Sequence, residues 1–70
     1  MTEYLAIYER NKDGWWAYVP DLPGCTAVGD DRDEVERNAR EAVAAHVDLL
    51  RSTGRPVPEP TTHDVSRIAV

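Results

Sequence analysis

The sequence predicts an α+β fold in which three antiparallel strands, one helix and a last strand follow in the order β-β-β-α-β. Three observations predict it. Short aromatic and aliphatic runs in the first half are separated by turn residues, which is typical of strands. A longer segment with a cap and helically spaced apolar residues follows, and a short apolar run comes last. A chain of 70 residues has room for one domain, so we expect residues 1–70 to form a single unit with the helix on one face of the sheet.

The first two strands are predicted to form a hairpin. Residues 3–9 are rich in aromatic and aliphatic types and are bounded by polar residues. The turn Asn11–Gly14 follows, and its Asp-Gly pair suits the positive φ angles of a tight hairpin. The second strand is Trp15–Val19, and it ends before Pro20 because proline has no N–H to donate to the ladder.

A compact loop and a short third strand come next. The loop Pro20–Gly24 has two prolines that fix φ and a glycine that suits a tight bend. Within it, the Asp21 carboxylate is expected to accept backbone N–H groups of the following turn, as in an Asx-turn. The run Cys25–Gly29 leaves the loop and is predicted as the third strand.

The helix has both of its ends marked. Asp31 is a good N-cap, and Glu34 stands three residues later, as in a capping box. Between the ends, one apolar stripe is formed by Val35, Ala39, Ala42, Val43, His46, Val47 and Leu50. Gly54 marks the C-terminal end, and the prolines after it prevent continuation. The final run Asp64–Val70 is expected to form the last strand.

Side chains alternate across a strand, so the length of the hairpin loop decides which residues share a face. With a loop of two or four residues, Tyr8 lies opposite Ala17 and Ala6 opposite Val19. One face then carries Tyr4, Ala6, Tyr8, Trp15, Ala17 and Val19. The other face carries Leu5, Ile7, Trp16 and Tyr18. A three-residue loop would instead exchange the two sides of the second strand.

One helix covers only one face of a small sheet, so a cluster of large apolar side chains is left over. We expect the helix on the Tyr4 face and a protein partner on the other, because exposed apolar patches mark interaction surfaces and Trp and Tyr are favoured anchors. With the neighbouring loop added, the predicted partner-binding residues are Leu5, Ile7, Trp16, Tyr18 and Asp21. The alternative is that these aromatic side chains lean over the sheet edges and cover one another.

Thirteen acidic against eight basic residues give a net charge of −5. Such a surface repels phosphate backbones, so direct nucleic-acid binding is not expected, and it attracts a basic protein. We expect a cytoplasmic protein, since no apolar run is long enough to span a membrane and the N-terminus lacks a signal-peptide pattern. A short chain with one cysteine has no disulfide to support its core, which favours a homo-oligomer, a dimer or higher.

Residues with reactive side chains are few, and we expect no catalytic, cofactor-binding or metal site. A metal-dependent nuclease needs several carboxylates that converge on two ions about 4 Å apart, whereas the strand acids here stand at strand ends. Cys25 is expected to be a small buried hydrophobe, since nothing near it in the sequence would lower its pKa. His46 and His63 make no standard zinc spacing with Cys25.

The run Gly14–Cys25 (GWWAYVPDLPGC), followed by Gly29-Asp30 and a helix, resembles the HicB family of antitoxins. The segment Gly54–Pro60 is similar to the family's exit from the helix, so the resemblance covers roughly residues 4–60. It implies a truncated RNase H-like β-β-β-α-β fold. It also implies an antitoxin of a type II toxin–antitoxin system, which neutralises HicA, a small basic RNA-cleaving toxin, by covering the toxin's active surface.

Two features differ from the family pattern. Family members often have threonine at the helix N-cap, where this chain has Asp31, and either side chain caps a helix. Many members also carry a C-terminal DNA-binding domain, and because this chain ends at Val70 we expect no direct DNA contact. Two alternative functions stay open. One is an orphan homo-oligomeric interaction domain without a toxin partner, and the other is a residual metal-dependent nuclease.

Overall fold

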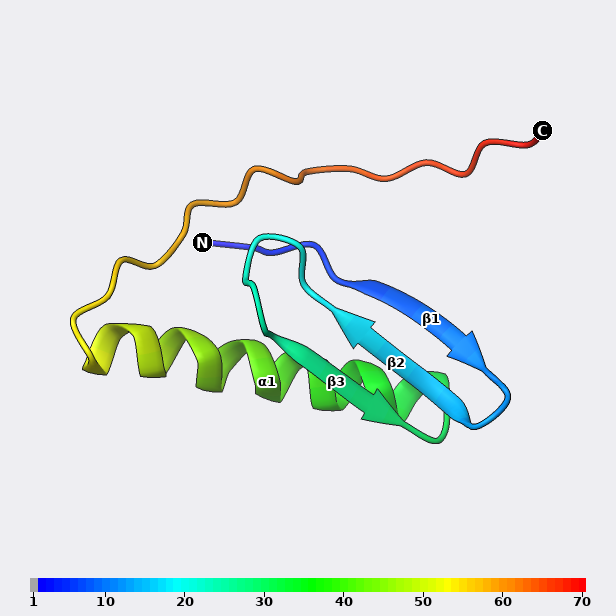
Figure 1. Ribbon diagram of the computed structural model, residues 1–70, viewed down its shortest axis with the longest axis horizontal. Coiled ribbons are helices and arrows are strands. Elements are labelled where there is room, and N and C mark those ends of the chain that lie inside the picture. The colour runs from blue at the N-terminus through cyan, green and yellow to red at the C-terminus, as the bar shows by residue number, and fades with distance from the viewer. Residues whose placement is uncertain (1) are drawn as a thin grey trace.

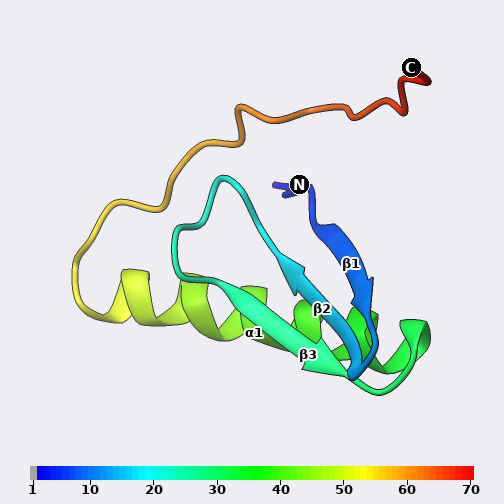
Figure 2. The same ribbon diagram turned by 45° about the vertical axis from the view of Figure 1, so that its right-hand side comes forward.

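The computed structural model describes residues 2–70, which form three strands and one helix (Figure 1). The strands are β1 (Ile7–Asn11), β2 (Gly14–Tyr18) and β3 (Thr26–Gly29), and the helix α1 spans Arg32–Ser52. They form one antiparallel sheet in the order β1-β2-β3, so β1 and β3 are its edges. The α+β class predicted from the sequence is confirmed, because α1 lies across one face of this sheet (Figure 2).

The hairpin has the register that the sequence predicts for a two-residue loop. Tyr8 lies opposite Ala17, and the turn Lys12–Asp13 joins β1 to β2. The side chain of Asn11 closes the turn, since its Oδ1 accepts a hydrogen bond of 2.8 Å from the Asp13 N–H. The predicted division of side chains between the two faces of the hairpin therefore holds.

The first strand begins later than predicted. The sequence predicts a strand over residues 3–9, whereas β1 begins at Ile7 and ends at Asn11. Continued backwards, the observed register would place residues 3–6 opposite residues 19–22, where the chain already turns into the next loop. Pro20 in that loop has no N–H to donate, so the N-terminal segment finds no ladder partner there.

Asp31 begins α1 as its N-cap, as the sequence predicts. Its Oδ1 accepts a hydrogen bond of 2.8 Å from the backbone N–H of Glu34. The Glu34 side chain in turn accepts a bond of 2.9 Å from the backbone N–H of Asp30, just before the cap. The N–H groups of the first helical turn have no intrahelical acceptor, and Asp31 supplies an acceptor for one of them, that of Glu34.

The core lies between α1 and the part of the sheet formed by β2 and β3. Its buried residues form two clusters, Ala17, Val35 and Ala39 in one and Val19, Leu22 and Cys25 in the other. Leu22 and Val35 are completely buried. The side chains of Tyr4, Ala6 and Tyr8 pack against these clusters, so the helix covers the face of the sheet that was predicted for it.

The end of α1 is formed by a Schellman motif. The N–H groups of Gly54 and Arg55 donate hydrogen bonds of 3.2 and 2.8 Å to carbonyl oxygens of the last turn. Gly54 has a φ of +71°, as the motif requires, and residues with a Cβ atom rarely adopt this angle. The helix therefore stops where the sequence predicts it.

The predicted last strand over Asp64–Val70 is not formed. A strand needs a neighbouring backbone, and this segment has none among residues 2–70, because the chain after α1 turns back past the N-terminal segment and then diverges from β1 (Figures 1 and 2). The observed order is therefore β-β-β-α, followed by residues 53–70 without helix or strand, in place of β-β-β-α-β.

Candidate protein-binding surface

One face of the sheet carries the apolar residues that do not meet the helix. The predicted residues Leu5, Ile7, Trp16 and Tyr18 alternate along the chain with those that pack against α1, so they lie on the opposite face. Val28 of β3 is paired with Trp16 and shares this face. We call these five residues the outer sheet face. Within the described part of the chain, neither α1 nor any strand packs on it.

The outer sheet face is apolar, aromatic and only partly shielded from solvent. Val28 exposes 70% of its surface, and the other four residues are half-buried. The rings of Trp16 and Tyr18 stack, with centroids 5.1 Å apart and planes inclined by 27°. Part of the burial therefore comes from the aromatic pair itself, as the alternative interpretation predicts. Both residues remain partly exposed, and large aromatic side chains of this kind are favoured as interface anchors.

Asp21 holds the C-terminal tail rather than the turn that follows it. Its carboxylate accepts hydrogen bonds from the backbone N–H groups of Thr61 and Thr62, at 3.0 and 2.9 Å. It also accepts bonds from their hydroxyls, at 2.9 and 3.1 Å. The N–H of Thr62 is the main cause that lowers the pKa of the Asp21 carboxyl below its ordinary value. The Asx-turn interpretation of Asp21 is therefore wrong, while its contact with a partner stays a prediction.

A second contact ties the tail to the start of the chain. The Tyr4 hydroxyl donates a hydrogen bond to the carbonyl oxygen of Pro58, which is 54 residues further along the sequence. Sequence reasoning missed this contact and the two threonines that bind Asp21, because no local pattern marks contacts across such separations. It also missed Val28, which could have been assigned only from the register between β2 and β3.

Residues with reactive side chains are not gathered into a site. Among residues 2–70, no group of three His, Cys, Asp or Glu side chains lies close enough to hold a metal ion. Cys25 is buried, and this burial raises the pKa of its thiol, which disfavours the nucleophilic thiolate. In the same residues, no helix is both long and apolar enough to cross a bilayer. The outer sheet face is therefore the surface that invites a functional interpretation.

Comparison with known proteins agrees with the sequence motif. Residues 4–68 match the family described as HicB_like antitoxin of bacterial toxin-antitoxin system. The chain belongs to this family. The resemblance noted in the sequence is thereby confirmed over nearly the whole chain. By this membership the chain is a HicB-like antitoxin of a bacterial toxin–antitoxin system.

The curated relatives of this HicB-like chain include proteins of a bacterium and of a phage. Antitoxin HicB 2 of Photorhabdus laumondii is 30% identical, and the match covers 84% of this chain and 42% of that protein. A 14.9 kDa protein from the rep-hol intergenic region of Haemophilus phage HP1 is 34% identical, with 80% and 42% covered. The HicB-like chain thus spans less than half the length of these two relatives.

The fold also matches a solved structure of a HicA3 and HicB3 toxin-antitoxin complex. The matching chain is 32% identical and superposes with a TM-score of 0.74. The match covers 86% of this chain and 70% of that chain. Both the sequence and the arrangement of the sheet and helix are therefore shared with a chain of that complex.

Proposed function

We propose that this HicB-like chain binds and neutralises a small, basic, RNA-cleaving HicA-like toxin in the cytoplasm, and that its outer sheet face covers the toxin's active surface. The observation that carries the proposal is the outer sheet face itself. It is a contiguous apolar and aromatic surface on the side of the sheet opposite to the single helix. The related solved structure, in which HicA3 and HicB3 form a complex, supports the choice of partner.

Trp16 and Tyr18 are the expected centre of the contact. Trp16 lies in the middle of the central strand β2, Tyr18 lies at its end, and their rings stack on each other. Because each ring already restricts the other, binding a partner loses less side-chain entropy than it would with two freely rotating side chains. Large aromatic side chains at the centre of an interface commonly contribute more than about 2 kcal/mol to binding. Val28 and Ile7 lie beside them on the neighbouring strands and extend the apolar contact.

Charge favours a basic partner. The chain has a net charge of −5, and oppositely charged surfaces accelerate the encounter between two proteins. The association rate with a basic toxin should therefore fall as salt is added, because ions screen exposed charges beyond about 10 Å at 0.1 M.

The test is calorimetric titration of a purified, catalytically inactivated HicA-like toxin with the unaltered chain and with Trp16→Ala and Tyr18→Ala. Each variant is expected to raise Kd by about 30-fold or more, which corresponds to about 2 kcal/mol. The matched control is Leu49→Ala, since Leu49 lies on α1 and is 60% exposed. It removes a comparable exposed apolar group away from the outer sheet face and should leave Kd unchanged.

Coexpression tests the same proposal in cells. The unaltered chain and Leu49→Ala should suppress the growth arrest caused by the toxin, and Trp16→Ala should not. Circular dichroism must show that Trp16→Ala keeps its helix. If a folded Trp16→Ala variant binds and protects as well as the unaltered chain, the outer sheet face is not the toxin-binding surface.

A further inference from the structure

The edge of the sheet at β1 is open, and a groove lies beneath it. The backbone of β1 lies farther from the helix than those of β2 and β3, and the Tyr8 side chain spans the gap to α1, so the first strand overhangs the helix. The space beneath it is lined by the apolar side chains of Tyr4, Ala6, Tyr8, Ala39 and Val43. We call this the edge groove. Because β1 pairs only with β2, one row of its backbone N–H and C=O groups also points outward without a strand beside it.

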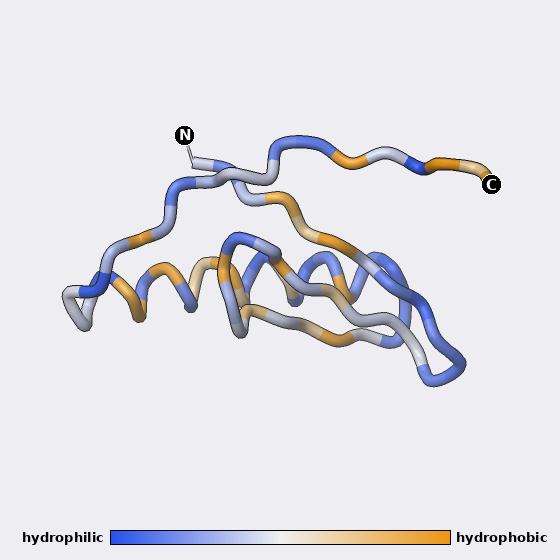
Figure 3. The backbone as a smooth tube through the Cα atoms, turned by 45° about the horizontal axis from the view of Figure 1, so that its top comes forward, coloured by the Kyte–Doolittle hydropathy of each residue, from blue (hydrophilic) through white to orange (hydrophobic). Residues whose placement is uncertain are grey.

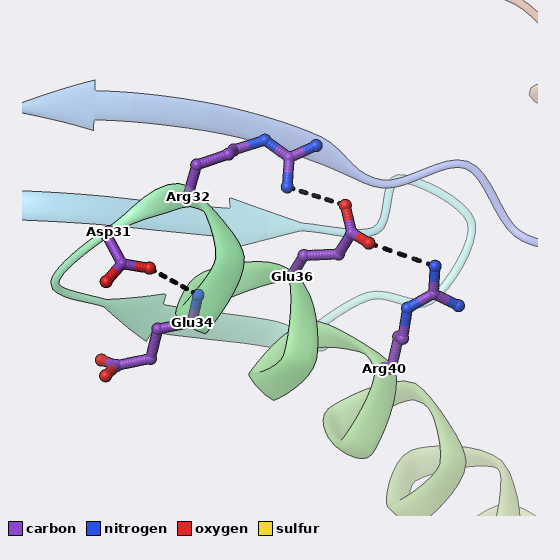
Figure 4. A network of polar contacts seen from close by, with 5 residues as sticks. All are labelled: Asp31, Arg32, Glu34, Glu36 and Arg40. Carbon is purple, nitrogen blue, oxygen red and sulfur yellow. Dashed lines mark hydrogen bonds and ion pairs between the residues drawn. The ribbon is translucent and has the colours of Figure 1, made fainter.

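The rim of the edge groove carries charges of both signs, unlike the acidic chain as a whole. Arg32 and Arg40 both bind Glu36, at 2.8 and 3.2 Å (Figure 4). The guanidinium of Arg32 also lies 3.7 Å from the centre of the Tyr8 ring, on the apolar wall. Glu3 also lines the groove, so two positive and two negative charges give this rim no net charge, on a chain whose total is −5. The rim therefore does not repel a strand that has no net charge.

The segment Asp64–Val70 has the properties of the missing strand. Its residues are exposed, among them Val65 at 59% and Ile68 at 81% of their surface. Figure 3 shows hydrophobic stretches at this end of the chain, and valine and isoleucine favour strands. One side of an extended segment would carry Ser66, Ile68 and Val70. The charges of Asp64 and Arg67 cancel, so the segment does not share the acidity of the rest.

The segment is directed away from its own β1. Hydrogen bonds of Thr61 and Thr62 to Asp21 hold the preceding residues beside the loop after β2. From there the chain and β1 diverge in both views of the fold (Figures 1 and 2). Eight further residues in extended form reach roughly 26 Å, enough to meet a neighbouring molecule. The anchored tail thus suits another copy better than its own sheet edge.

We infer that Asp64–Val70 of one copy pairs as a fourth strand with the β1 edge of a second copy and places Ile68 in that copy's edge groove. Each copy offers the same strand and the same edge, so the exchange is reciprocal and closes as a two-fold symmetric dimer. Pairing satisfies the outward backbone groups of β1, and it buries apolar side chains that both parts now expose. The added strand lies beside β1, so Trp16, Tyr18 and Val28 on β2 and β3 stay free for toxin binding.

Sedimentation equilibrium over about 10 to 500 µM tests the dimer, because the fraction of a reversible dimer rises with protein concentration. The unaltered chain should reach the mass of a dimer. Ile68→Asp should raise the dimer Kd by about 30-fold or more, because a charge would enter an apolar groove. Leu49→Asp, a matched change at an exposed leucine of α1, should leave Kd unchanged. A monomer throughout for the unaltered chain, or equal dimerisation by Ile68→Asp, would overturn the inference.

Isotope-filtered NMR of labelled and unlabelled chains mixed in equal amounts tests the exchange and needs no substitution. Contacts from the Ile68 methyl groups to the Tyr8 ring should appear between differently labelled chains. If these contacts occur only within one chain, the segment pairs with its own β1. If a dimer forms without them, it uses another surface. Either result rules out the exchanged strand.

Discussion

Gly29 lies so close to Val35 that no side chain fits at position 29, between the end of β3 and α1. A Cβ atom at position 29 would stand 2.6 Å from the backbone nitrogen of Val35 and 2.9 Å from its Cα. Both are backbone atoms of the helix, and they cannot move away as the end of a flexible side chain can. Gly29 therefore sets how closely the start of α1 approaches the sheet, and Val35 is completely buried as a result.

The first prediction is that Gly29→Ala destabilises the chain. The added methyl group must push the helix from the sheet, and such overpacking commonly costs about 1–3 kcal/mol. Urea unfolding followed by circular dichroism measures the loss. The control is Thr26→Ala, at an exposed position of the same strand, which should change the free energy of unfolding by less than about 0.5 kcal/mol. Equal stability of the two variants would contradict the close packing at Gly29.

Leu22 should be the most costly leucine to truncate. It belongs to the loop after β2, yet it is completely buried beside Val19 and Cys25. Leu22→Ala removes buried methyl groups and leaves a cavity, which commonly costs about 2–5 kcal/mol. A loss of that size should lower the thermal midpoint sharply in a domain this small. Leu49→Ala serves as the control. Because Leu49 is 60% exposed, this variant should have the same thermal midpoint as the unaltered chain.

Removing the N-cap should weaken α1 without affecting the sheet. Asp31→Ala deletes the acceptor of the Glu34 N–H, and the loss of such a cap commonly costs about 1 kcal/mol. Glu41→Ala removes an acid from an exposed position inside the same helix and should be nearly neutral. The comparison uses free energies of unfolding in urea. A neutral Asp31→Ala variant would show that the cap contributes nothing to stability.

The contact between Asp21 and the tail should depend on pH. The pKa of the Asp21 carboxyl is lowered in the folded chain, chiefly by the N–H of Thr62. The ionised carboxylate therefore holds the tail. Its stabilising effect is fully present above the ordinary pKa of 3.8 and is lost as the pH falls through the lower folded value. The amide signals of Thr61 and Thr62 in an NMR titration should shift with a midpoint below 3.8.

Two variants separate this effect from general acid unfolding. Asp21→Asn keeps the size of the side chain but removes its charge, so Thr61 and Thr62 should show their released signals already at neutral pH. Asp64→Asn alters a tail acid whose Oδ1 accepts only from the N–H of the next residue, and it should keep the titration. A midpoint above 3.8 would mean that the carboxylate is not stabilised by the tail.

Features that depend on nearby residues could be predicted from the sequence. The register of the hairpin follows from the length of its turn and from the strict alternation of side chains. The ends of α1 follow from the side chain of Asp31 and the conformational freedom of Gly54. The division of apolar residues between the two faces follows in turn, and with it the candidate surface around Trp16 and Tyr18.

Features that depend on a distant backbone could not be predicted in this way. Residues 3–6 and Asp64–Val70 have the composition of strands, but a strand forms only where a neighbouring backbone supplies hydrogen bonds. Whether one is present depends on where the loop at Pro20 and the chain after α1 lead. The acceptor role of Asp21 toward Thr61 also spans 40 residues, which no local turn pattern reveals.

Tyr4 and Asp21 hold the tail by hydrogen bonds, so the tail should detach from the protein without unfolding of the core. The core of β2, β3 and α1 is held by buried apolar side chains, whereas the tail is held beyond it by hydrogen bonds. Amide hydrogens of Glu59, Thr61 and Thr62 should therefore exchange with solvent far faster than those of α1. Trypsin should cleave at the exposed Arg67 while the helical part stays intact, so partial digestion leaves a shorter, folded protein.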